Sequence, residues 1–195
     1  MSSLTFIRIL ATLMLLCFTD FGDFLESRHF VINCRRFHAI LDNMIHVWIG
    51  ILSWIIFTED PFGKCQDLIA VALGASVIDL DHFLAAQSFS VDAAMSAGKR
   101  GIFHCTGLAI LISLVLFRLK GRSSALLFLL AVIPHHLRDA QRRGLYVLPF
   151  THQLDTPPLN RALVRLLLPL VPWVLILANH LQAGNPPTIS RVFNV

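Results

Sequence analysis

The residues of this chain that could carry chemistry are histidines and aspartates at the ends of apolar runs. The clearest group is Ser76-Val77-Ile78-Asp79-Leu80-Asp81-His82-Phe83, which closes an apolar run that begins near Leu68. On a helix Asp79 and His82 share a face, whereas Asp81 joins them only if the last turn unwinds. Such groups beside hydrocarbon usually pair with one another, face a polar interior or hold a cation. For this octapeptide alone, a helix cap with a salt bridge is the simpler interpretation.

The composition is that of an integral membrane protein. Of 195 residues, 55% are hydrophobic and only 14% are charged, whereas about 25% are charged in a soluble domain. The net charge of +4 therefore indicates Lys and Arg in loops at a lipid surface, and we expect no nucleic-acid partner. The four cysteines form no CxxC pair, so the sequence predicts neither a zinc knuckle nor a disulfide framework.

Six apolar runs predict the helices that must position these groups. They cover approximately residues 4–19, 43–58, 67–86, 102–118, 124–141 and 161–181. We expect one integral membrane domain over residues 1–195, an all-α polytopic bundle of about six spans. The first run could be a cleaved signal peptide, but Asp20 and Asp23 make a poor cleavage site, which favours a retained helix. Residues 21–41 mix aromatic and basic side chains, as in an interfacial segment or a surface loop.

The alternating direction of the spans brings the polar groups to one side of the membrane. Short connections make successive spans antiparallel, so the second and fourth spans begin on the side where the third and fifth end. We call this side A. The residues that converge there are His46, Asp79, Asp81, His82, His104, His135 and Asp139.

We expect these residues to bind a divalent metal ion, with Zn or Mn as the leading candidates. Zinc sites use three or four nitrogen and oxygen ligands, and the lack of a cysteine in the set favours hard or borderline metals. The spacing of four between Asp42 and His46, and between His135 and Asp139, suits a carboxylate that orients a ligating imidazole. The predicted metal ligands are His46, Asp79, His82, His104, His135 and Asp139. The remaining histidines that we expect at the surface are His29, His38, His152 and His180.

Several segments resemble the transmembrane protein 267 family, a poorly characterised eukaryotic multi-pass family. They are Asp42-Asn43-Met44-Ile45-His46, Ala75-Ser76-Val77-Ile78-Asp79-Leu80-Asp81-His82-Phe83, Phe103-His104-Cys105 and His135-His136-Leu137-Arg138-Asp139. The resemblance runs from about residue 40 to 155, with matching order and spacing.

More distantly, the Asp-x-Asp-His, Arg-Gly-x-x-His and His-x-x-x-Asp elements are similar to the bacterial YdjM-type inner-membrane proteins, predicted to be metal-dependent hydrolases. This resemblance implies roles as metal ligands or their partners for Asp79, Asp81, His82, His104, His135 and Asp139. Where the bacterial pattern reads His-Arg-Gly-x-Thr-His-Ser, this chain has Lys99-Arg100-Gly101-Ile102-Phe103-His104-Cys105. One His, the Thr and the Ser of that pattern are therefore replaced.

Two functions of different classes follow from these observations. The first is a metal-dependent hydrolase of a lipid or lipid-linked phosphate, with Asp81 and Arg100 as the predicted catalytic residues. In it, Asp81 would act as the base. The arginines that could bind a phosphate are Arg100, Arg138, Arg142 and Arg143. The second is a non-catalytic membrane protein in which the cluster is a structural metal or hydrogen-bond site and the function lies in a partner.

A transporter is a third, weaker alternative, because the central spans lack the Gly- and Pro-interrupted midplane helices of many transporters.

Side A would face the cytosol, since nine of the Lys and Arg residues fall there and six on side B. Those nine are Arg28, Arg35, Arg36, Lys99, Arg100, Arg138, Arg142, Arg143 and Arg161, and those six are Arg8, Lys64, Arg118, Lys120, Arg122 and Arg191. Residues 149–160, which contain three prolines, are expected to cover part of the polar cavity as a lid.

Overall fold

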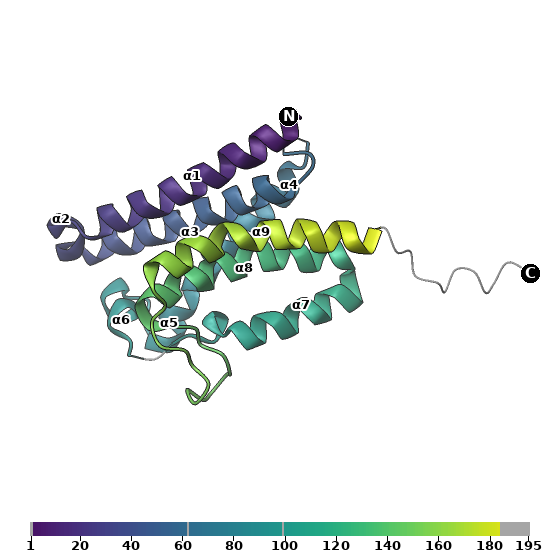
Figure 1. The fold of residues 1–195 in the computed structure, drawn as a ribbon. Coiled ribbons are helices and arrows are strands. Elements are labelled where there is room, and N and C mark those ends of the chain that lie inside the picture. Colours follow the sequence, from purple (N-terminus) through teal and green to yellow (C-terminus); the bar gives the residue numbers. More distant parts are fainter. Residues whose placement is uncertain (1, 62, 99, 184–195) are drawn as a thin grey trace, which may run out of the picture.

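A computed structural model describes residues 2–61, 63–98 and 100–183 and consists of helices packed lengthwise (Figure 1). The helices are α1 (Ser3–Glu26), α2 (His29–Asn33), α3 (Arg35–Phe57), α4 (Cys65–Val77), α5 (Asp81–Ala86), α6 (Val91–Ser96), α7 (Thr106–Lys120), α8 (Arg122–Arg143) and α9 (Arg161–Ala183). Two 3₁₀ turns, η1 (Ile78–Leu80) and η2 (Ile102–His104), precede α5 and α7. The predicted all-α bundle is confirmed.

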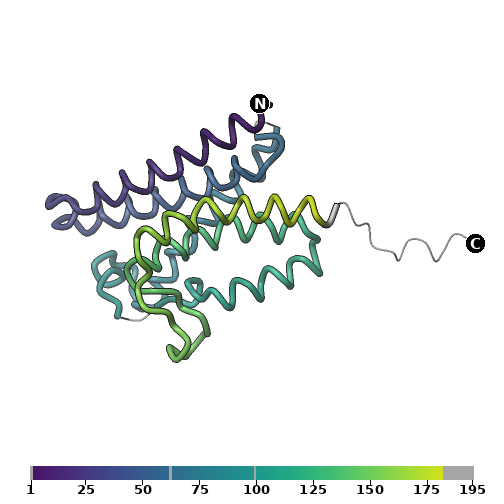
Figure 2. The backbone as a smooth tube through the Cα atoms, viewed as in Figure 1, coloured from purple at the N-terminus to yellow at the C-terminus, as the bar shows by residue number. Residues whose placement is uncertain are grey.

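The short elements gather at one end of the bundle. In Figure 2 the tube places α2, α5, α6 and the long loop before α9 at one end, while α1 begins and α9 ends at the other. The first end is the predicted side A, because the second and fourth spans begin there. The tracing of antiparallel spans is therefore confirmed, although which side faces the cytosol stays a prediction.

The helices α1 and α3 are longer than the apolar runs that predicted them. Helix α1 continues to Glu26 instead of ending near residue 19, and α3 begins at Arg35 instead of near residue 43. The additional turns carry charged side chains that form ion pairs with α8 and α9. Because hydropathy registers only apolar residues, these turns were outside the predicted spans.

Two apolar clusters hold the long helices together. In the first, Leu15 of α1, Ile49 of α3 and Leu168 of α9 are fully buried. In the second, Trp54 of α3 and Leu130 of α8 pack with residues of α4 and α7. Small residues bring α3 and α4 together, since a Cβ on Gly50 would lie 3.1 Å from the Cβ of Ala75.

The third predicted span is broken at its end. Residues 67–86 were expected as one helix, but η1 separates α4 from α5. A 3₁₀ turn has three residues per turn and shifts the face on which later side chains lie. As a result Asp79 and Asp81 both turn toward the protein, and Asp81 is only 1% exposed.

Within the residues that the structure describes, four helical segments are long and apolar enough to cross a membrane. They are α1, α3, the run Cys65–Ala86 and α9. The two other predicted spans form α7, which has 15 residues, and α8, whose last turns are polar. A helical membrane bundle agrees with both the sequence and the structure.

Filling the space at Gly50 should destabilise the bundle. We expect Gly50→Val to lower the free energy of unfolding by about 1–3 kcal/mol, because the added atoms must force α3 and α4 apart. The thermal midpoint in detergent measures the effect. Gly98→Val is the matched control, since a Cβ there meets nothing within 4 Å. Equal midpoints for the two variants would show that the close approach at Gly50 contributes little.

Candidate metal centre

The six predicted metal ligands meet at the side A end of the bundle. They are His46 on α3, Asp79 on η1, His82 on α5, His104 on η2, and His135 and Asp139 on α8. Donor atoms of His46, Asp79, His135 and Asp139 lie within 4.8 Å of one another, as do those of Asp79, His82 and His104. Asp79 belongs to both groups.

Five distances among four donor atoms are close to those around a tetrahedral ion. The Nε2 atom of His104 lies 3.4 Å from Nε2 of His135 and 3.2 Å from Oδ2 of Asp139. Asp79 Oδ1 lies 3.5 Å from Nε2 of His104 and 3.4 Å from Nε2 of His135. His135 Nε2 and Asp139 Oδ2 are 3.7 Å apart. Ligands about 2.0–2.1 Å from a tetrahedral metal are separated by about 3.3–3.4 Å.

The two central imidazoles are oriented through their Nδ1 atoms. His104 Nδ1 lies 3.0 Å from Oδ1 of Asp81, and His135 Nδ1 donates to the carbonyl of Ala75 at 3.0 Å. A hydrogen bond at Nδ1 fixes the tautomer and leaves the Nε2 lone pair available to a metal. The sequence had suggested Asp139 as the partner that orients His135, but a backbone carbonyl takes that place.

Asp81 lies in a position to orient His104. Its Oδ2 also accepts hydrogen bonds from the backbone N–H groups of Phe103 at 2.7 Å and His104 at 3.3 Å. The turn fits only with glycine at position 101, because a Cβ there would lie 1.9 Å from Cγ of Asp81. Both oxygens of this carboxylate are therefore engaged, which argues against the predicted role of Asp81 as the base.

His46 lies at the edge of the cluster, where its contact with Asp139 lacks hydrogen-bond geometry. Its ring stacks on His135 with centroids 3.6 Å apart, and its Nε2 lies 3.2 Å from Oδ1 of Asp139. Among the described residues, both ring nitrogens of His46 and this oxygen are buried without a hydrogen bond. Each unsatisfied buried group costs about 1–3 kcal/mol. A cation at the cluster would satisfy His46 and Asp139 together, so the donor set fits a metal.

Two supporting residues were missed by the sequence analysis. Asn43 donates to Oδ2 of Asp79 at 3.3 Å and is itself held by Ser76. His136 Nε2 donates to the carbonyl of Phe103 at 2.9 Å, so it braces the turn that carries His104. The spacing of Asn43 three residues before His46 would have placed it on the same face of α3.

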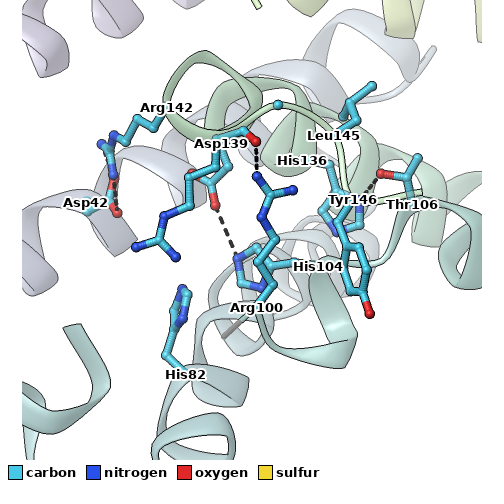
Figure 3. Close-up of a pocket in the computed structure, with 12 residues that line it drawn as sticks. Asp42, His82, Arg100, His104, Thr106, His136, Asp139, Arg142, Leu145 and Tyr146 are labelled. Carbon is cyan, nitrogen blue, oxygen red and sulfur yellow. Dashed lines mark hydrogen bonds and ion pairs between the residues drawn. The ribbon is translucent and has the colours of Figure 1, made fainter. Parts of the chain in front are cut away.

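A cavity of about 110 Å³ opens beside the cluster. Figure 3 shows His82, Arg100 and Arg142 around His104 and Asp139. Arg100 donates a hydrogen bond to the carbonyl of Arg143. Burial lowers the pKa of Arg100, yet an Arg side chain stays charged at neutral pH. The cavity therefore places a cationic group close to the candidate ligands.

Only the first residues of the loop before α9 form part of the cavity wall. Residues 149–160 were expected to cover the cavity, but the loop residues that line it are Gly144, Leu145 and Tyr146. The rest of the loop braces that wall, with Asp155 accepting from the N–H of Val147 at 3.1 Å. Burial alone would raise the pKa of Asp155, but hydrogen bonds from His152 and Val147 lower it.

Arg138 is part of a buried ion cluster and not of the cavity. It is 2% exposed and contacts Asp42 at 2.5 Å, Glu26 at 2.9 Å and Asp23 at 3.4 Å. Arg142 contacts Glu26 at 2.6 Å and Asp42 at 3.0 Å. The expectation that Arg138 binds a phosphate is therefore wrong, because its charge is already neutralised. Asp42, expected to orient His46, lies 3.7 Å from its Nε2 atom and also pairs with both arginines.

Comparison with known proteins identifies relatives of one kind. The chain is similar to transmembrane protein 267 of Mus musculus, with 35% identity over 62% of this chain and 59% of the relative. The Danio rerio protein of that name is 41% identical over 57% of this chain and 55% of the relative. The Xenopus laevis protein of that name is 34% identical over 73% of this chain and 70% of the relative. The matches thus span less than two thirds of the mouse and zebrafish proteins.

No protein-family model matches the chain. No solved structure matches it either. The more distant resemblance to YdjM-type proteins receives no support from these comparisons.

Removing the Arg138 charge should strongly destabilise the protein. We expect Arg138→Met to lower the free energy of unfolding by about 3–5 kcal/mol, because buried carboxylates lose their cation. Arg161→Met is the control, since Arg161 is 54% exposed in its pair with Asp20 and should contribute less than about 1 kcal/mol. Denaturation in detergent would measure both variants. A small loss for Arg138→Met would mean that water solvates these carboxylates.

Proposed function

The chain belongs to the transmembrane protein 267 family, and for this member we propose a metal-dependent hydrolase that acts on a phosphate ester at the side A end of the bundle. The observation that carries the proposal is the spacing of two imidazole and two carboxylate donors at 3.2–3.7 Å. Adjacent to them is a cavity with a cationic group. A bare hydrogen-bond network would leave the buried Nδ1 of His46 unsatisfied.

Five residues would hold the ion. His104 and His135 would bind through Nε2, Asp79 and Asp139 through carboxylate oxygens, and His46 would complete the set from the edge. The structure gives Asp79 a hydrogen bond from Asn43, and His104 one to Asp81. A bound divalent ion would lower the pKa of its water toward about 7.

The chain's own residues supply the rest of the chemistry. Hydrolysis forms a bond from the water oxygen to phosphorus and breaks the ester P–O bond, and one water proton ends on the departing oxygen. Arg100 would bind the phosphate oxygens, as the sequence analysis predicted. His82 would carry the proton, because it lines the cavity and is the most exposed imidazole of the cluster, at 29%.

His82 could bind the metal or transfer a proton, and one variant distinguishes the two roles. The sequence predicted it as a sixth ligand, and its Nε2 lies 3.8 Å from Asp79 Oδ1. Its exposure and its longer contact favour proton transfer over metal binding. His82→Ala should therefore keep its metal and lose activity. Loss of the metal would assign His82 to the ligands instead.

The non-catalytic alternative is favoured by one observation. His46 and His135 are 0% exposed, so part of the cluster lies out of reach of a substrate and ties α3 to α8. In this alternative a metal or a hydrogen-bond network would only stabilise the helix ends. The protein would then depend on the metal for stability but would release no phosphate from any ester.

The metal content of the purified protein tests the site. We expect about one equivalent of zinc or manganese in detergent-purified full-length chain, and its loss in His104→Ala. Zinc at about 100 times its dissociation constant should stabilise the wild-type protein by about 2.7 kcal/mol. His180→Ala is the matched control, because His180 is exposed on α9. Equal metal in both variants would exclude this site.

Asp81→Asn separates the two roles considered for Asp81. As an orienting partner, its loss should weaken metal affinity about 10–100-fold. If Asp81 were the base, the variant would instead keep its metal affinity and lose phosphate release. Isothermal titration with zinc, together with phosphate release from an alkyl phosphate, distinguishes the outcomes.

A further inference from the structure

A second, larger hollow lies beside the metal centre. It has a volume of about 490 Å³ and runs between α3, α5 and α6. Its walls are largely apolar, with side chains that include Ile40, Met44, Phe83 and Met95. Ligand pockets commonly have volumes of about 300–1,000 Å³. This hollow, which we call the tail groove, is therefore large enough for a ligand, whereas the 110 Å³ cavity suits only a small group.

The tail groove and the cavity share their polar end. The residues that line both are Asp42, His82, Arg142 and Arg143. Asp79 of the metal centre also lines the groove. A molecule lying in the groove would thus have one end at the candidate ligands and the other among apolar side chains.

The charges around this shared end favour an anion. The carboxylate of Asp42 already contacts Arg138 and Arg142, and that of Asp79 accepts from Asn43 and faces the imidazoles. Arg143 and Arg36 are exposed beside the groove. The described part of the chain shows no carboxylate paired with either arginine. Their charges complement a phosphate.

We propose that the tail groove holds the hydrocarbon chain of a phosphate-headed amphiphile, whose phosphate reaches the cavity between His82 and Arg100. The inference rests on the proposed function and names its substrate class, an alkyl or isoprenyl phosphate. Comparison with another groove supports the choice. A hollow of about 240 Å³ between α8 and α9 is lined only by aliphatic residues. It offers nothing to bind a head group.

Photolabelling tests the proposal. Full-length, zinc-loaded protein in phosphatidylcholine nanodiscs is irradiated with an alkyl phosphate that carries a diazirine in its chain. We expect labels on Met44 and Met95, roughly tenfold above those from the matching alkyl alcohol, because a charge-assisted contact holds only the phosphate. Unlabelled alkyl phosphate should compete, and inorganic phosphate should compete only at much higher concentration.

Two variants fill the groove from opposite walls. Ala39→Trp on α3 and Met95→Trp on α6 should each lower labelling of Met44 about tenfold, since the bulky ring excludes the chain. Val174→Trp, which fills the aliphatic groove between α8 and α9, is the matched control and should leave labelling unchanged. Equal labelling by phosphate and alcohol, or labels scattered over α1, α7 and α9, would overturn the inference.

Metal content measured on the same samples separates this inference from the proposed function. Bound metal with an unlabelled groove would refute the binding of the amphiphile but would still support the metal site. A labelled groove in a protein that binds no metal would refute the hydrolase and leave an amphiphile-binding protein. Retained metal in both groove-filling variants shows that they are folded.

Discussion

Buried charged groups need partners, and this requirement determines how the helices of this protein meet at side A. Charged groups beside hydrocarbon are costly unless they are paired, and breaking a buried pair costs several kcal/mol. The last turns of α8 carry Arg138 and Asp139 on neighbouring faces. Arg138 draws carboxylates from α1 and α3, while Asp139 meets imidazoles from α3 and η2. The side A end is thus organised as two adjoining polar clusters around one helix.

Much of this could be predicted from the sequence because helix direction is a simple constraint. Once His46, His104 and His135 are placed at ends of antiparallel spans, their meeting follows. The detailed roles did not follow. The 3₁₀ turn that directs Asp81 toward His104 depends on tertiary contacts. The partners of Arg138 lie on turns of α1 and α3 outside the predicted spans. Long-range ion pairs leave no local pattern in a sequence.

The two clusters differ in their access to solvent. Arg138 and its carboxylates have little exposure and fix how α1 approaches α8, whereas His82 and His104 border a cavity. Arg100 and Arg143 line the cavity without an ion pair among the described residues, and in this they differ from Arg138. An arginine acts as a ligand-binding group only where no carboxylate of the protein has already taken its charge.

The short α7 has a consequence for the surrounding bilayer. Its 15 residues extend about 22 Å, and Leu111 and Leu114 on its surface are more than half exposed. A typical hydrocarbon core is about 30 Å thick. A helix shorter than the hydrocarbon core is accommodated by thinning of the lipid beside it, at a cost of fractions of a kcal/mol per ångström of mismatch. Thin bilayers reduce this mismatch, and thinning would bring lipid head groups nearer to η2, where His104 lies at the base of α7.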